Sequence, residues 1–290
     1  MSVLPPSIAT AGRPNPYVGP RAFQRGEVLY GRDREVLELI DLLIAERIVL
    51  FYSPSGAGKT SLIQAALVPE LENEDFYVFP VMRLGLEAPA HSQPADRRAN
   101  RYILSLLLRL EEALPEADRL PASTLSTMSL SDYLEYVCAN QTRPCGPVLI
   151  FDQFEEILTL DPVDRMVKLA FFEQVGRALR DGRRWALFSM REDHLAGLDP
   201  YLRAVPTRLS TTYRLELLGA RAASEAIQQP ARDHGVRFEA SAAARLIDDL
   251  RRVRVQCPDG STEEQPGPFV EPVQLQVVCY QLWENMQGKP

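Results

Sequence analysis

The chain has 290 residues, of which 46% are hydrophobic and 24% are charged, and its formal net charge is −7. These values are typical of a globular protein that has a substantial core and is built as one large domain or two smaller ones. The acidic balance argues against DNA or RNA as the main partner, because a broad grip on phosphates needs clustered positive charge.

Residues 1 to about 25 are predicted to form an extended leader, because they are rich in proline, glycine and arginine and show no hydrophobic periodicity. The first ten residues, MSVLPPSIAT, lack a basic region and a long apolar run, so no signal peptide is evident. No segment reaches the roughly 18 apolar residues that a membrane span needs. We therefore expect a cytoplasmic protein.

A helix, a strand and a second helix are predicted around a glycine-rich segment. Apolar residues at helical spacing from Val36 to Ile44 indicate the first helix. The run IVLFYS at 48–53 is short and uniformly apolar, which is typical of a parallel strand covered on both faces. After the glycines, TSLIQAALVPEL has a helical pattern that we expect to stop near Pro69.

Strands and helices continue to alternate along the chain. Further strands are predicted at 76–84, 148–152, 185–190 and 211–218. Pro80 weakens the first of them, because proline cannot donate to a strand ladder. Helices are predicted at 99–114, 130–141 and 164–182. The alternation predicts a parallel sheet with right-handed crossovers and helices on both faces.

Strand signals cease after residue 218. Three later segments have helical patterns: 224–235, 241–255 and 271–286. Residues 256–269 have the composition of a polar, turn-rich loop. We therefore place a domain boundary near Gly219, with an α/β core at 26–218 and a small helical subdomain at 219–290.

The four cysteines show no metal-binding pattern. None forms a CxxC pair, and with three scattered histidines they offer no zinc spacing. We interpret all four as free thiols in a reducing cytoplasm. They are Cys138, Cys145, Cys257 and Cys279.

The segment YSPSGAGKTS at 52–61 has the features of a phosphate-binding loop. Backbone N–H groups in a tight glycine loop, together with a helix N-terminus, form a cradle for phosphate oxygens. In such loops the lysine reaches the β- and γ-phosphates, and the next hydroxyl binds Mg²⁺. We predict a nucleotide site with Thr60 at the metal, formed by Ser55, Gly56, Ala57, Gly58, Lys59, Thr60 and Ser61.

One residue departs from the usual pattern of such loops. Ser53 stands where the first glycine belongs, at the point where the strand passes into the loop. Because the groups that face the phosphates lie mainly between Gly56 and Thr60, we expect altered loop geometry and retained binding. A serine-nucleophile elbow is the competing interpretation, but the residues flanking Ser55 at the two glycine positions of that motif are Ser53 and Ala57.

Acidic residues follow the apolar strand in VLIFDQFEE. Asp152 is predicted at the carboxyl edge of the sheet, where a Walker B aspartate holds Mg²⁺. Glu155 and Glu156 come next, and one of them could orient or deprotonate the attacking water. The alternative is an ordinary acidic turn at the surface.

Arg191 follows directly on another apolar strand, in WALFSMRED. An arginine at this position could contact a γ-phosphate and report its presence. The alternative is a structural ion pair with Glu192, Asp193 or another acid.

Several stretches together resemble the STAND class of signal-transduction ATPases, and most closely the bacterial "novel STAND" type. They are NPYVGPRAF, VLYGRDREV, PSGAGKTS, VLIFDQFEE, FSMREDHL and EPVQLQVVCYQLWE. The resemblance covers about residues 15 to 286. The phosphate loop alone is unspecific, whereas the leader, the DQFEE strand end and the late helix in this order are specific.

The resemblance implies an AAA+-related sheet of order 5-1-4-3-2 followed by a helical lid. It implies that Tyr30, Gly31 and Arg32 lie near the base and ribose, and that Arg191 is the first sensor. It also implies that Pro272 of the lid contacts adenine. The family pattern there is Gly-x-Pro, and Val270 replaces the glycine.

Members of this class are usually switches that use ATP and ADP with Mg²⁺. The resemblance implies oligomerisation on activation and coupling to effector and sensor domains of repeat or propeller type. We expect this chain to be part of a longer protein, or its effector and sensor to be separate chains. Many relatives act in bacterial defence or regulation.

Three other functions compete with the switch. The departures at Ser53 and Val270 suit a scaffold that keeps its nucleotide and does not hydrolyse it. A small-molecule phosphotransferase would need an arginine-bearing lid, which we cannot single out. A DNA-remodelling ATPase would need a basic groove, which the acidic composition disfavours.

Overall fold

A computed structural model describes residues 13–84, 100–140, 146–161, 163–256 and 262–287. The chain divides into two compact units. The sheet unit comprises Glu35–Ser55 and Ile63–Leu215. The helical unit comprises Met1–Arg34, Gly56–Leu62 and Glu216–Pro290, so the glycine-rich segment is grouped with the leader and the C-terminal segment.

The sheet unit contains five parallel strands in the order β2-β3-β4-β1-β5. Read from the other edge, this is the expected order 5-1-4-3-2, and the predicted parallel sheet is confirmed. The strands are β1 (Ile48–Ser53), β2 (Tyr77–Val78), β3 (Pro147–Phe151), β4 (Trp185–Arg191) and β5 (Thr212–Arg214).

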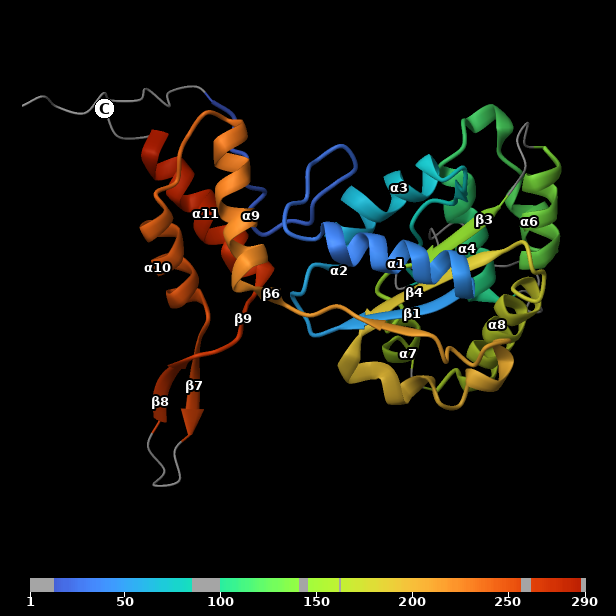
Figure 1. Cartoon of the computed structure of the whole chain (residues 1–290). Coiled ribbons are helices and arrows are strands. Elements are labelled where there is room, and N and C mark those ends of the chain that lie inside the picture. Colours follow the sequence, from blue (N-terminus) through green and yellow to red (C-terminus); the bar gives the residue numbers. More distant parts are fainter. Residues whose placement is uncertain (1–12, 85–99, 141–145, 162, 257–261, 288–290) are drawn as a thin grey trace, which may run out of the picture. The chain divides into compact units, whose positions relative to one another are not determined.

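Helices cover both faces of this sheet (Figure 1). Every residue of β3 is buried, as expected of a central strand whose two faces both meet helices. The larger helices of the sheet unit are α1 (Asp33–Glu46), α4 (Arg101–Glu112), α6 (Leu130–Ala139) and α8 (Arg165–Ala178). The sheet unit also contains two single-turn helices, α5 (Ala122–Leu125) and α7 (Glu156–Thr159).

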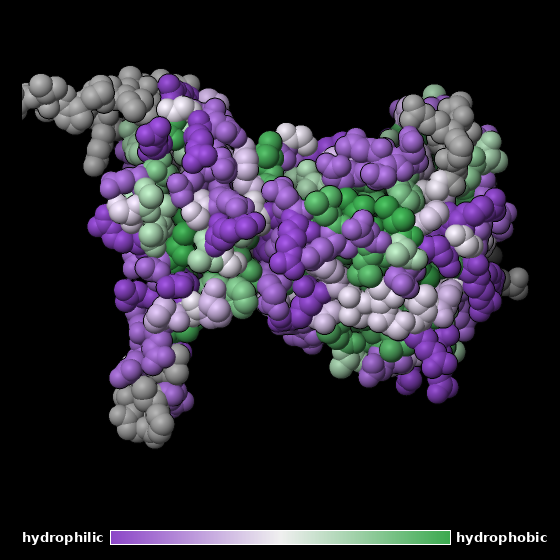
Figure 2. Space-filling model, in the orientation of Figure 1, coloured by the Kyte–Doolittle hydropathy of each residue, from purple (hydrophilic) through white to green (hydrophobic). Residues whose placement is uncertain are grey.

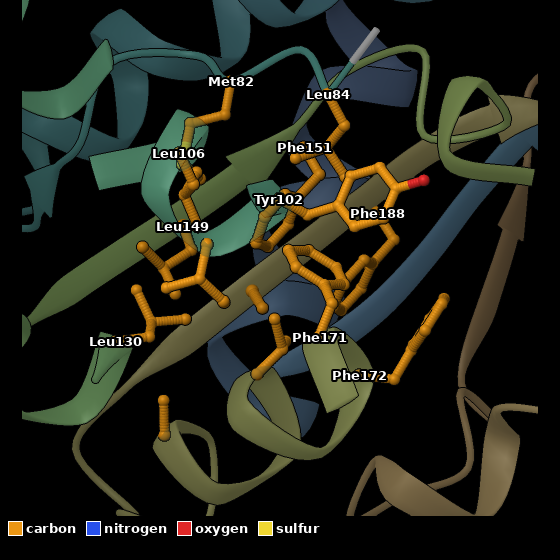
Figure 3. Packing of buried hydrophobic residues seen from close by; sticks show 14 of the residues in the cluster. Met82, Leu84, Tyr102, Leu106, Leu130, Leu149, Phe151, Phe171, Phe172 and Phe188 are labelled. Atoms are coloured by element: carbon orange, nitrogen blue, oxygen red, sulfur yellow. The ribbon is translucent and has the colours of Figure 1, made fainter. Parts of the chain in front are cut away.

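Aromatic rings pack between the central strands and α8 (Figure 3). The rings of Phe151 in β3 and Phe188 in β4 stack with centroids 5.0 Å apart and planes 6° apart. Phe154, which follows β3, meets Phe188 edge-on, with centroids 4.9 Å apart. These contacts fix the ends of β3 and β4. The predicted catalytic residues lie after β3 and at the end of β4.

Two details of the sheet unit differ from the sequence-based expectations. The helical segment after the glycines does not stop near Pro69 but runs through α2 (Lys59–Leu62), a π-helical turn at Ile63–Leu67 and α3 (Val68–Asn73). Pro69 lies in the first turn of α3, where its missing N–H costs least. The strand predicted at 76–84 contains only the two-residue β2 and an isolated bridge from Met82 to Phe151.

The helical unit is built from α9 (Ala220–Asp233), α10 (Ala240–Leu250), α11 (Pro272–Gln287) and the described part of the leader. Residues 13–32 contain neither helix nor strand. The Tyr17 hydroxyl donates to the Ile227 carbonyl over 2.5 Å, and its ring meets the buried Trp283 with centroids 6.1 Å apart. The leader therefore forms part of the core of this unit, and the leader residues 1–12 lie outside the described range.

The prediction that strands cease after residue 218 is wrong. β6 (Leu218–Gly219) pairs antiparallel with β9 (Phe269–Val270), and β7 (Arg252–Gln256) pairs antiparallel with β8 (Thr262–Pro266). The sequence RVRVQ alternates with period two, which suits a strand rather than the continued helix that we expected. Its partner lies downstream, in a segment that composition alone assigned to a loop.

The prediction of four free thiols is wrong for Cys138, which is disulfide-bonded. Disulfide formation depends on Cα atoms about 4.4–6.8 Å apart, which the fold sets and sequence spacing does not. Cys279 is free and buried, and Cys145 and Cys257 lie outside the described residues.

Within the described part of the chain, no helix is both long and apolar enough to cross a membrane.

The visible surface is largely hydrophilic, with apolar residues gathered in separate patches (Figure 2). On α1, the side chains of Leu37 and Ile44 are exposed, whereas Val36, Leu39, Ile40 and Leu43 are buried against the core.

Candidate functional site

The glycine-rich loop joins the end of β1 to the start of α2. Gly56 and Gly58 have φ angles of 78° and 91°, in the left-handed region that side chains disfavour. The unusual Ser53 is fully buried, and its hydroxyl donates to the Pro54 carbonyl over 2.7 Å. The serine is therefore accommodated at the end of the strand, and the loop keeps glycine where the backbone requires it.

Leader residues hold the loop within the helical unit. Arg32 is buried, and its Nη2 donates to the Ala57 carbonyl over 3.1 Å and to the Glu216 carbonyl over 2.8 Å. The Phe23 N–H donates to the Ser61 hydroxyl oxygen over 3.2 Å. Arg32, expected near the base and ribose, thus binds the backbone of the phosphate loop itself.

Gly31 allows the leader to approach α9 closely. Its φ is 77°, and a Cβ added there would lie 2.5 Å from the Ala222 carbonyl oxygen. Any side chain at this position would collide with backbone. The neighbouring Tyr30 donates its hydroxyl hydrogen to the Asp233 carboxylate, and burial, followed by this hydrogen bond, raises the pKa of Tyr30 to about 12.

A mainly apolar pocket of about 50 Å³ lies between the leader, the loop and the N-terminal part of α11. Six predicted site residues contribute to its wall: Tyr30, Arg32, Ala57, Gly58, Ser61 and Pro272. Ligand sites are usually concave and lined mainly by apolar side chains with a few polar groups, as this pocket is.

The junction of β9 and α11 approaches the glycines of the loop. Pro272 begins α11, and its Cβ would lie 3.9 Å from a Cβ added to Gly58. Val270 is buried and pairs with Leu218 in β6, so this position serves as part of a strand. The residue between Val270 and Pro272 in the sequence is Glu271, and its side chain lies against Gly56. Sequence reasoning missed Glu271, although it lies within the quoted EPVQLQ motif.

In the sheet unit, Asp152 follows β3 and its side chain is 1% exposed. Its Oδ1 accepts a hydrogen bond from the Ser189 hydroxyl over 3.0 Å, and its Oδ2 lies 3.4 Å from Arg83 Nη2. Its N–H donates to the Met82 carbonyl over 2.8 Å. A buried carboxylate requires such partners, because desolvation of an unpaired charge is costly.

Sequence reasoning also missed Arg83 and Ser189, although each left a signal. Arg83 is the last residue but one of the apolar stretch FYVFPVMRL, and Ser189 interrupts the apolar strand WALFSM. Both signals are weak in isolation. Ser189 reaches Asp152 from the neighbouring strand β4, and Arg83 reaches it from the segment after β2, next to the bridge between Met82 and Phe151.

The two glutamates lie in and just before α7. Glu156 is the first residue of this helix, and Glu155 precedes it. A carboxylate oxygen of Glu155 accepts a hydrogen bond from the Arg191 backbone N–H over 3.3 Å. The acidic turn and the end of β4 are thus in contact within the sheet unit.

Arg191 forms an ion pair, as the structural alternative expected. Its Nε and Nη2 donate to the two oxygens of Asp193 over 3.1 and 2.6 Å. This bidentate hydrogen bond lowers the pKa of Asp193 and raises the pKa of Arg191. In the parallel register, Arg191 lies opposite Ser53, the last residue of β1 before the glycine-rich loop.

The donor set suits magnesium held together with phosphate. Among the described residues, no group of three or more His, Cys, Asp or Glu could hold a metal unaided. Mg²⁺ is usually bound by one or two carboxylates plus substrate phosphates, and it keeps several waters. The Asp152 carboxylate and the Thr60 hydroxyl are donors of the required kind.

This sheet order, with a glycine-rich loop between the first strand and a helix, is the architecture of P-loop nucleoside triphosphatases. The chain belongs to the Novel STAND NTPase 1 family, whose family model matches residues 16–289. The predicted resemblance to the novel STAND class is thereby confirmed.

Solved structures share the fold at low sequence identity. A Walker-type ATPase of Pyrococcus abyssi superposes with a TM-score of 0.58 at 14% identity, over 91% of this chain and 71% of that chain. A chain of the E. coli MS115-1 HORMA:CdnC:Trip13 complex superposes with a TM-score of 0.51 at 13% identity, over 90% of each chain. A comparison with curated proteins finds no match.

Proposed function

We propose that this NTPase module binds ATP with Mg²⁺, hydrolyses it slowly and uses the bound nucleotide as a switch. The observation that carries the proposal is the loop itself. Gly56 and Gly58 have left-handed φ angles, and Lys59 and Thr60 begin the helix that follows them. Backbone amides at such a loop and helix start favour phosphate.

The other proposed nucleotide contacts are assigned within each unit separately. In the helical unit, the pocket lined by Tyr30, Arg32 and Pro272 would receive the base and ribose, beside Gly31. In the sheet unit, we assign the buried Asp152 to magnesium, and in the loop we assign Thr60 to the same role. We assign ATP rather than GTP as the bound nucleotide on the basis of family membership.

For hydrolysis, we assign Glu155 or Glu156 to the attacking water and Arg191 to the γ-phosphate. Support comes from the acidic turn and the β4 end, which are in contact. Arg191 would have to exchange Asp193 for phosphate, which is a means of reporting the γ-phosphate.

The wider role is a proposal carried by family membership. We infer a core at 26–218 and a lid at 219–290 whose arrangement depends on the nucleotide, with a homo-oligomer formed on activation. Effector and sensor domains of repeat or propeller type would transmit the signal, in bacterial defence or regulation. The cytoplasm supplies the ATP that such a switch consumes.

The test compares ATP binding and phosphate release by the wild type, Lys59→Ala, Glu155→Gln and Glu156→Gln. Lys59→Ala loses charge-assisted hydrogen bonds of about 1.5–3 kcal/mol, which corresponds to a roughly 10- to 150-fold weaker affinity. One glutamate variant should keep ATP binding and lose turnover, while the other serves as its matched control. Equal ATP affinity in wild type and Lys59→Ala would refute the proposal.

The second candidate function is a nucleotide-holding scaffold without hydrolysis. The ion pair of Arg191 with Asp193 favours it, since that arginine is engaged elsewhere. The same experiment separates the two functions, because γ-phosphate loss that disappears in a glutamate variant excludes a scaffold.

A further inference from the structure

A carboxylate lies against the phosphate loop in the helical unit. A Cβ added to Gly56 would lie 3.0 Å from Glu271 Cδ and 3.2 Å from Glu271 Cγ. The side chain of Glu271 therefore occupies the space over Gly56 that a residue other than glycine would need.

The position of Glu271 is set by structure on both sides. The preceding residue, Val270, is buried in β9 and paired with Leu218. The following residue, Pro272, begins α11, and the Glu271 carbonyl accepts the Leu275 N–H over 3.1 Å. The end of the strand and the start of the helix thus bring this carboxylate to the loop. Within the described residues, no hydrogen bond or ion pair engages it.

A carboxylate in this place opposes the function of the loop. The loop amides and the start of α2 attract phosphate oxygens, whereas a negative charge in contact with Gly56 repels them. The interaction between like charges grows with the number of phosphate charges and shrinks with added salt.

The residues that follow Glu271 line the pocket beside the loop. They are Pro272, Val273, Leu275 and Gln276 of α11. Because Glu271 directly precedes these residues in the chain, a shift of the start of α11 would carry its carboxylate along.

We propose that Glu271 sets nucleotide affinity and release by opposing phosphate charge at the Gly56 end of the loop. This inference rests on the proposed function, namely nucleotide binding at that loop. Glu271 weakens binding most for ATP, less for ADP and not at all for adenosine. It thereby keeps the bound nucleotide exchangeable.

The experiment measures affinities of ATP, ADP and adenosine by calorimetry, and ATP release by stopped flow, for the intact chain and Glu271→Gln. We expect Glu271→Gln to bind ATP about tenfold more tightly and to release it more slowly, since unit charges near a protein surface interact at this scale. The gain should be smaller for ADP, absent for adenosine and reduced at high salt. Glu263→Gln, an exposed hairpin residue, is the control with the same change in net charge.

The possible outcomes distinguish a failure of this inference from a failure of the proposed nucleotide binding at the loop. If the wild type binds ATP and Lys59→Ala does not, but Glu271→Gln binds ATP no more tightly than the wild type, the role of Glu271 is refuted alone. If Glu271→Gln binds ATP more weakly than the wild type, the carboxylate holds ribose or metal. This outcome also refutes the proposed repulsion of phosphate by Glu271. Equal tightening for adenosine would indicate packing rather than charge. If Glu271→Gln fails to fold, Glu271→Ala and Glu271→Asp take its place.

Discussion

Asp152 is a buried carboxylate whose two oxygens have different partners. Ser189 donates to Oδ1 from within the sheet, where it is fully buried. Arg83 reaches Oδ2 with a side chain that is 37% exposed, so water screens this ion pair. A cation binding at Oδ2 would therefore compete with the weaker partner, while the Ser189 hydroxyl continues to orient the carboxylate.

The pH dependence of stability should reflect Cys279 in α11. Burial raises the pKa of this thiol to about 12. An unfolded thiol has a pKa of about 8.5 and loses its proton first, so the free energy of unfolding falls as pH rises from about 9 towards 12. We expect this one group to contribute a slope of up to about 1.4 kcal/mol per pH unit.

Urea unfolding at several pH values between about 7.5 and 10.5 measures this effect. Cys279→Ala should flatten the decline, although it lowers stability at every pH because it leaves a small cavity. An unchanged slope in Cys279→Ala would assign the alkaline decline to other groups. The buried Tyr17 is one, since burial also raises its pKa.

At the scale of elements, the aromatic packing of β3, β4 and α8 supports the strand ends that carry the proposed site residues. Phe188 is fully buried and contacts Phe151 (Figure 3). It also contacts Phe154. Its strand also carries Ser189 and Arg191. Loss of this ring therefore affects stability and the position of the site residues together.

Phe188→Ala is expected to lower the free energy of unfolding by about 3–5 kcal/mol, because it removes a large buried side chain and leaves a cavity. Urea denaturation measures the change. Met166→Ala is the matched control on α8, where the side chain is 74% exposed, and should stay within about 0.5 kcal/mol. A loss below about 1 kcal/mol in Phe188→Ala would show that the core repacks.

Local sequence patterns predicted most elements but not all their ends. The buried strands β1, β3 and β4 are short apolar runs bounded by charged residues, glycine or proline, which makes them visible. The hairpin of β7 and β8 was missed, because a strand that is exposed and charged lacks this signal. Its cross-strand pair, Arg254 with Glu264, is seen only when the strands meet.

At the scale of the whole molecule, a switch requires that ATP and ADP bind two arrangements with different free energies. The predicted site residues belong to both units, with Lys59 and Pro272 in the helical unit and Asp152 and Arg191 in the sheet unit.

This view predicts a nucleotide-dependent association state. Whichever of Glu155→Gln and Glu156→Gln keeps ATP but loses turnover should sediment as a larger species with ATP and Mg²⁺ than with ADP. Lys59→Ala should show no difference between the two nucleotides. Identical sedimentation under all conditions would argue against oligomerisation driven by this module alone.

The sequence by itself determined the class of the protein, because a phosphate loop and buried strands are encoded in consecutive residues. Gly56, Lys59 and Asp152 are recognisable from their immediate neighbours. Only the tertiary structure decided which residues surround them. Arg83 and Ser189 reach Asp152, and Glu271 reaches Gly56, across separations of 37 to 215 residues. Such contacts depend on strand order and helix packing, which local patterns do not specify.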